Sequence, residues 1–188
     1  MNFTVTPTDG VCGAVVGDID LTKELDSGTV AALREAWLKH HLLVFPNQPM
    51  NDEDLQRFTL YFGEFGEDPY LGTIDDSTPV VELSHLANEK APIFAENWHT
   101  DWSFLPIPPA GTCLLGLTIP PVGGDTGFIN QHKALAEMPT ELRSRIEGKT
   151  ALHSAATAYA PDGLYGEGEK DSDRSMKILY SEEARNLE

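Results

Sequence analysis

A histidine and an aspartate, His99 and Asp101, stand two residues apart in the segment Asn-Trp-His-Thr-Asp-Trp at positions 97–102. On an extended backbone, residues i and i+2 project from the same face, so an imidazole nitrogen and a carboxylate oxygen can reach one metal ion. Fe(II) accepts these donors, and two histidines with one carboxylate leave coordination positions open for oxygen chemistry. We therefore expect His99 and Asp101 to be metal ligands. The simpler alternative is a surface loop in which His99 is solvated.

The composition limits the classes of partner. The chain has 188 residues, 40% of them hydrophobic, and a formal charge of −17 from 13 basic and 30 acidic residues. This balance argues against nucleic acid and anionic membranes as partners, and an anionic substrate needs a local cationic pocket. The sequence has no apolar run long enough for a membrane span and no visible secretory signal. Two cysteines far apart in sequence fit a reducing compartment, so we expect a cytoplasmic protein.

The elements that position the pair are predicted from apolar spacing and capping residues. Helices are expected after Asp26 and after Asn51, and over 140–146, because a capping side chain precedes or begins each apolar pattern. Strands are expected at 41–45, 79–83, 111–119, 125–130 and 149–153, with Gly and Pro turns between several of them. Early helices followed by short strands predict a mixed, β-rich core with flanking helices.

Several short motifs occur in an order and spacing that resemble a known family. They are Leu43-Val44-Phe45, Phe62-Gly63-Glu64, Asn97-Trp98-His99-Thr100-Asp101, Pro108-Pro109-Ala110-Gly111 and Gly123-Gly124-Asp125-Thr126. With them the chain resembles the taurine dioxygenase-like (TauD/TfdA) family of Fe(II)/2-oxoglutarate-dependent dioxygenases. The segment 97–126 carries the most specific part of the resemblance.

The resemblance implies one catalytic domain over residues 1–188 with a double-stranded β-helix, or jelly roll, that is incomplete in this chain. It implies that His99 and Asp101 hold Fe(II), that Thr126 contacts the cosubstrate 2-oxoglutarate, and that Trp102 lies near the substrate. In relatives, a distal histidine ligand and an arginine for 2-oxoglutarate follow further along the chain, and we expect this chain to stop before both. His153 is the candidate substitute ligand, although relatives often have a histidine here that binds no metal.

The implied activity is hydroxylation of a small organic substrate by O₂, with release of succinate and CO₂. Relatives that act on taurine have Asn where this chain has Ala95, and a His in the loop that here reads Phe-Gly-Glu-Asp-Pro-Tyr at 65–70. Taurine is therefore not the expected substrate, and Tyr70 is a candidate hydrogen-bond donor to another one.

The alternative is a non-catalytic or partner-dependent scaffold fragment that lacks the distal His and Arg. Two residue roles stay open: Thr126 as a plain strand residue, and Trp102 as a core residue. A homo-oligomer is also left open.

Overall fold

The structure is a computed structural model that describes residues 3–169 and 174–187. Its internal contacts divide the chain into two compact units. The first unit combines Met1–Gly63 with Cys113–Lys149, and the second combines Glu64–Thr112 with Thr150–Glu188. The single catalytic domain stays a prediction.

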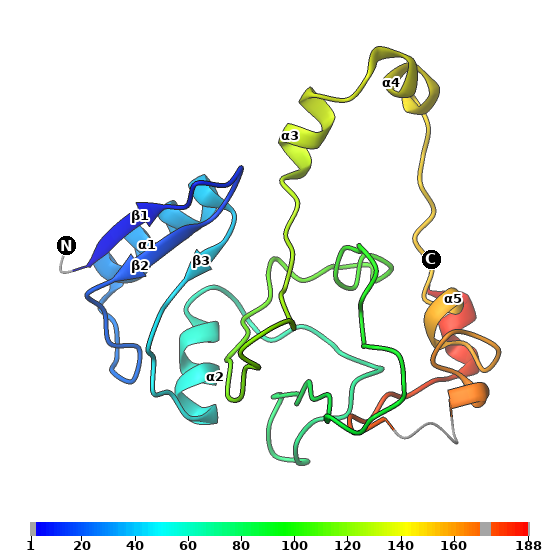
Figure 1. Ribbon diagram of the computed structural model, residues 1–188, viewed down its shortest axis with the longest axis horizontal. Helices are drawn as coiled ribbons and strands as arrows, with labels where there is room; N and C mark the ends of the chain where they lie inside the picture. Colours follow the sequence, from blue (N-terminus) through cyan, green and yellow to red (C-terminus); the bar gives the residue numbers. More distant parts are fainter. Residues whose placement is uncertain (1–2, 170–173, 188) are drawn as a thin grey trace. The chain divides into compact units, whose positions relative to one another are not determined.

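A small mixed sheet forms the base of the first unit. Strand β1 (Thr4–Pro7) pairs antiparallel with β2 (Ala14–Gly17), and β2 pairs parallel with β3 (Leu43–Val44). A parallel pair needs a crossover connection, and helix α1 (Ser27–His40) supplies it between β2 and β3 (Figure 1). The expected strand at 41–45 is thus confirmed at Leu43 and Val44.

Helix α1 begins where the sequence predicts. Asp26 is its N-cap, and one side-chain oxygen of Asp26 accepts hydrogen bonds from the backbone N–H groups of Gly28 and Thr29. These bonds satisfy two of the amides that a helix start leaves without an intrahelical partner. Leu33 of α1 is fully buried and shares a hydrophobic core with Val16 of β2. The helix therefore covers one face of the sheet.

Helix α2 (Asp52–Leu60) begins with a capping box. The Asn51 side chain accepts a hydrogen bond from the Asp54 N–H, and the Asp54 carboxylate accepts one from the Asn51 N–H. Phe58 faces inward and belongs to the same core as Leu33. The prediction of a helix after Asn51 is confirmed.

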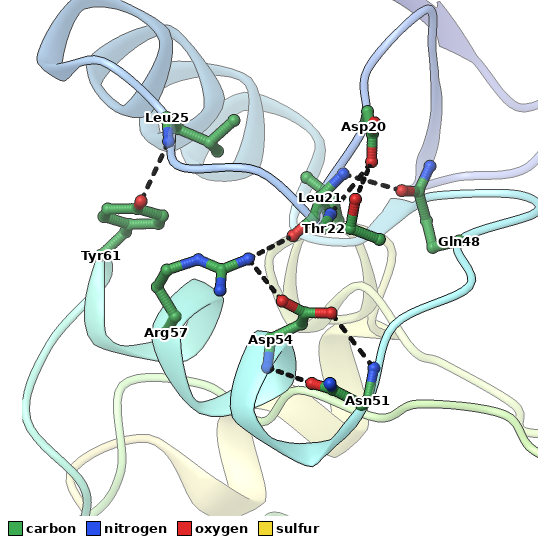
Figure 2. A network of polar contacts seen from close by, with 9 residues as sticks. All are labelled: Asp20, Leu21, Thr22, Leu25, Gln48, Asn51, Asp54, Arg57 and Tyr61. Atoms are coloured by element: carbon green, nitrogen blue, oxygen red, sulfur yellow. Dashed lines mark hydrogen bonds and ion pairs between the residues drawn. The ribbon is translucent and has the colours of Figure 1, made fainter.

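Polar side chains of α2 and of the segments on either side of it form hydrogen bonds with the loop that precedes α1 (Figure 2). The Gln48 amide accepts a hydrogen bond from the Leu21 N–H at 2.9 Å and donates one to the Ile19 carbonyl at 3.0 Å. Arg57 donates to the Leu21 carbonyl at 3.0 Å, and the Tyr61 hydroxyl accepts from the N–H of Leu25 at 2.9 Å. This irregular loop therefore has its backbone groups paired by side chains instead of by a strand.

Two further helices belong to the first unit. Helix α4 (Thr140–Ile146) has the predicted bounds, although Pro139 occupies the N-cap position and makes no side-chain cap bond. Helix α3 (Gln131–Ala136) directly follows the segment expected as a strand at 125–130, and the Asn130 side chain caps it by accepting a hydrogen bond from Lys133 N–H. The Asn130 amide also donates to the Val11 carbonyl at 3.0 Å, which ties α3 to the loop before β2.

Most of the later strands predicted from sequence are wrong for this structure. The segments 111–119, 125–130 and 149–153 are irregular, and within 79–83 Val81 forms only an isolated bridge with Thr73. A strand exists only where a second strand pairs with its N–H and C=O groups, and within the described residues no strand pairs with 111–119, 125–130 or 149–153. Large apolar side chains of these segments consequently stay exposed; they are Leu114, Leu117, Ile119, Phe128, Ile129 and Leu152.

The second unit has an aromatic core. It contains helix α5 (Ala156–Tyr159) and the short 3₁₀ helices η1 (Glu167–Glu169) and η2 (Glu182–Asn186). We call Tyr70, Trp102, Phe104, Tyr159 and Tyr165 the aromatic cluster, because ring–ring contacts connect all five. Tyr70 and Tyr159 lie at its centre with parallel rings whose centroids are 4.2 Å apart.

A buried carboxylate joins two loops of the second unit. The Glu89 side chain is 1% exposed and accepts hydrogen bonds from the hydroxyl and the N–H of Ser175 at 2.7 and 3.1 Å. The N–H of Leu86 also donates to it at 3.2 Å, and His85 Nδ1 lies 3.4 Å from its other oxygen. Hydrogen bonds from Ser175, with smaller contributions from Leu86 and His85, lower the pKa of Glu89 to about 2. We call this group the Glu89 clasp.

Within residues 3–169 and 174–187, no helix is long and apolar enough to cross a membrane.

Candidate metal centre

His99 and Asp101 face each other in the second unit. Nε2 of His99 lies 3.1 Å from Oδ1 of Asp101, and each side chain is about half exposed, at 49% and 51%. Nδ1 of His99 is 2.7 Å from the carbonyl oxygen of Asn97. A carbonyl oxygen can only accept a hydrogen bond, so Nδ1 carries a proton and donates it. In a neutral imidazole this leaves the lone pair on Nε2, the nitrogen that faces the carboxylate.

This arrangement suits a cation. A lone pair on His99 Nε2 and a carboxylate oxygen 3.1 Å away repel each other unless a positive charge accompanies them. A proton on Nε2 is one solution, and a metal ion bound by both atoms is the other. The 3.1 Å separation would let both atoms reach one metal ion. An imidazole nitrogen and a carboxylate oxygen are donor types that Fe(II) accepts, so this pair would fit it chemically.

The backbone that places the two side chains differs from the expected strand. Residues 98–100 are irregular, and Asp101 begins a turn that continues to residue 104. Trp102 lies in the left-handed region with φ 43°, and its carbonyl accepts a hydrogen bond from Leu105 N–H at 3.0 Å. The side chains of His99 and Asp101 thus converge through a turn, although the sequence argument assumed an extended segment.

The two candidate substrate residues have packing roles. Tyr70 is 2% exposed at the centre of the aromatic cluster, and burial raises the pKa of its hydroxyl. Trp102 packs partly buried against Phe104 and Tyr159, whereas Trp98 is 70% exposed. The alternative of a core position is therefore the one observed for Trp102. A substrate contact by either residue stays a prediction.

Thr126 belongs to the first unit. Its side chain is exposed in the irregular segment that precedes α3. The turn before it contains Gly123 and Gly124 at φ 79° and 71°, a region that glycine enters without steric cost. The predicted turn at Gly123 and Gly124 is confirmed, and the predicted strand at 125–130 is not. The contact of Thr126 with 2-oxoglutarate stays a prediction.

His153 pairs with a hydroxyl. Its Nδ1 lies 2.7 Å from the hydroxyl oxygen of Ser103, two residues after Asp101. Within residues 3–169 and 174–187 no group of three or more His, Cys, Asp or Glu side chains is placed to hold a metal. The structure thus brings together His99 and Asp101, and it connects His153 to the turn that follows them.

Sequence reasoning missed the groups that orient the pair. The Thr112 hydroxyl donates a hydrogen bond to Oδ2 of Asp101 at 2.7 Å, and the carbonyl of Asn97 accepts from His99. Backbone carbonyls carry no sequence signal. A threonine eleven residues after the aspartate is also a common strand residue, so its type alone does not predict this role.

Comparison with known proteins decides the family. Residues 4–183 match the model of the family described as "Taurine catabolism dioxygenase TauD, TfdA family". The chain belongs to this family. Proteins of the TauD/TfdA family use Fe(II) and 2-oxoglutarate, the pair that the sequence motifs implied.

The names of the related proteins refer to different substrates. An "Alkylsulfatase" of Acinetobacter baylyi is 34% identical over 151 residues, which cover 80% of this chain and 46% of that protein. An "(S)-phenoxypropionate/alpha-ketoglutarate-dioxygenase" of Sphingobium herbicidovorans is 32% identical over 154 residues, covering 81% of this chain and 53% of the relative. The chain spans about half the length of the curated relatives it matches.

A solved structure agrees with this assignment at the level of the fold. The crystal structure of a taurine dioxygenase from Burkholderia xenovorans matches with a TM-score of 0.59 and 31% identity, covering 79% of this chain and 52% of that one. This TauD-type neighbour supports the fold class. Within the described residues, the short three-stranded sheet with its helices is not a complete jelly roll.

Proposed function

We propose that this TauD/TfdA chain provides part of the active site of an Fe(II)- and 2-oxoglutarate-dependent dioxygenase that hydroxylates a small organic substrate. The observation that carries the proposal is the converging pair of His99 Nε2 and Asp101 Oδ1, 3.1 Å apart, within the family match. Family membership and the oriented pair favour this function over a non-catalytic scaffold. The double-stranded β-helix is our proposal for the surrounding fold, supported by the taurine dioxygenase structure.

In this proposal each residue has a defined task. His99 and Asp101 hold the metal through Nε2 and Oδ1, and the Asn97 carbonyl keeps the proton of His99 on Nδ1. Thr126 contacts a carboxylate of 2-oxoglutarate, as the family motif implies. When bound, Fe(II) and 2-oxoglutarate supply the oxidising chemistry with O₂, and the products include succinate and CO₂. The half-exposed ligand pair is open to the cosubstrate and to solvent.

We propose a small organic anion as the substrate class. The relatives' names include an alkylsulfatase and a phenoxypropionate dioxygenase, both of which point to anionic organic molecules. In both classes a carbon is bonded to an oxygen atom, and hydroxylation at that carbon lets the ester or ether C–O bond break. Because the chain has a net charge of −17, such a substrate requires local cationic groups to offset the general repulsion.

The test is metal- and cosubstrate-dependent turnover in the full protein. Succinate formation from 2-oxoglutarate would be followed with an alkyl sulfate, 2-phenoxypropionate or taurine, each with Fe(II) and O₂. We expect turnover with one of the first two, and loss of at least two orders of magnitude in His99→Ala and Asp101→Ala, since each variant removes a ligand. His132→Ala, an exposed histidine of the first unit, is the control that keeps activity. Undiminished succinate formation in His99→Ala would show that the ligand assignment is wrong.

The remaining partner assignments stay predictions from composition. We propose O₂ and small molecules as partners, with no nucleic acid or membrane partner, and a cytoplasmic location. Both cysteines, Cys12 and Cys113, are free thiols in the structure.

A further inference from the structure

The two carboxylate oxygens of Asp101 have different partners. Oδ1 faces His99 Nε2 at 3.1 Å, while Oδ2 accepts a hydrogen bond from the Thr112 hydroxyl at 2.7 Å. Thr112 follows the Pro-Pro-Ala-Gly segment at 108–111, so it reaches Asp101 from a different stretch of the same unit. Thr112 and Asp101 are therefore brought together by the fold, and not by being adjacent in the sequence.

A carboxylate needs such a partner to present one oxygen in a fixed direction. The terminal torsion of aspartate is broad and roughly two-fold, so an unrestrained group samples many orientations. The Asp101 side chain is half exposed, and packing alone does not restrain it. A hydrogen bond from a hydroxyl to a charged oxygen at 2.7 Å is shorter and stronger than one between neutral groups. It fixes Oδ2 and thereby directs Oδ1 toward His99.

We infer that Thr112 is a positioning residue for the metal centre. Its hydroxyl orients Asp101 as the Asn97 carbonyl orients His99, so that both ligands meet the metal with their directions already set. This inference rests on the proposed metal function of the pair. Groups that orient metal ligands in this way typically contribute 10–100-fold to metal affinity.

The test measures binding of Mn(II) alone to the full chain, from the electron paramagnetic resonance signal of the free ion. Thr112→Val keeps the shape of the side chain and removes the hydroxyl, whereas Thr112→Ser keeps the hydroxyl. We expect Thr112→Val to weaken Mn(II) affinity about 10-fold or more and Thr112→Ser to stay within about twofold of wild type. Thermal unfolding without metal should be nearly the same for all three proteins, because the Thr112 side chain is exposed.

His99→Ala separates failure of the inference from failure of the proposed function. If Thr112→Val binds Mn(II) as tightly as wild type while His99→Ala loses binding, the metal site stands and the positioning role of Thr112 is refuted. Equal losses in Thr112→Val and Thr112→Ser would also refute it, because the hydroxyl would then not be the active group. Unchanged affinity in His99→Ala would overturn the metal site together with the inference.

Discussion

Replacing Tyr159 by leucine should destabilise the second unit strongly. The Tyr159 ring is parallel to Tyr70 at 4.2 Å between centroids and contacts Trp102, Tyr165 and Phe104 at 5.8, 5.7 and 6.1 Å. Each such pair contributes about 0.5–1.5 kcal/mol beyond the area it buries. Because neighbouring contacts are not additive, and because leucine retains part of the buried surface, we expect a loss of about 3 kcal/mol in the free energy of unfolding.

Thermal unfolding followed by near-ultraviolet circular dichroism gives the measurement. For a chain of this length, about 3 kcal/mol corresponds to a decrease of about 6–12 °C in the midpoint. The matched control is Tyr159→Phe, which keeps the ring and removes only the hydroxyl; burial in the aromatic cluster raises the pKa of that group well above its ordinary value. If the midpoints of Tyr159→Leu and Tyr159→Phe agree within about 2 °C, the aromatic cluster does not stabilise the unit as argued here.

Three further changes test other parts of the fold. Glu89 has a pKa lowered from 4.5 to about 2, so the stability it contributes is present above pH 4.5 and is lost as the pH falls toward 2. The free energy of unfolding, measured with urea, should fall steeply as the pH is lowered through that range in wild type and less steeply in Glu89→Gln. Equal pH dependence in the two proteins would contradict the role of the Glu89 clasp. Gln48→Ala removes three hydrogen bonds, to Leu21 N–H and to the carbonyls of Ile19 and Pro46, and should cost about 2–3 kcal/mol in urea unfolding. Leu33→Ala removes a fully buried side chain and should cost about 2–5 kcal/mol in the same measurement, with exposed Leu38→Ala as its near-neutral control.

Helices were predictable because their signals are local. Asp26 and Asn51 cap α1 and α2 through hydrogen bonds to amides within three residues, so the sequence window contains both partners. Helix α3 follows a run of β-favouring residues that ends at Asn130, and the Asn130 cap is its local signal. A capping residue at the end of an apolar run is the signal that identifies such a helix.

Strands were less predictable because they depend on distant partners. The apolar segment 111–119 has the composition of a buried strand, yet no described residues supply its hydrogen bonds. Composition indicates that a segment is suited to pairing, and pairing itself is settled by the rest of the fold. The same limit applies to the site, where the His99–Asp101 pair could be inferred from its spacing and the Thr112 contact could not.

The closeness of His99 and Asp101 in sequence has a thermodynamic consequence. With one residue between them, the unfolded chain keeps both donors near each other at a small loop-closure cost. A metal ion held by this pair alone would therefore also have some affinity for the unfolded chain. Ligands stabilise a fold only through their preference for the native state, so such a metal would raise the melting temperature less than its affinity suggests. What folding adds is direction, supplied by the carbonyl of Asn97 and the hydroxyl of Thr112.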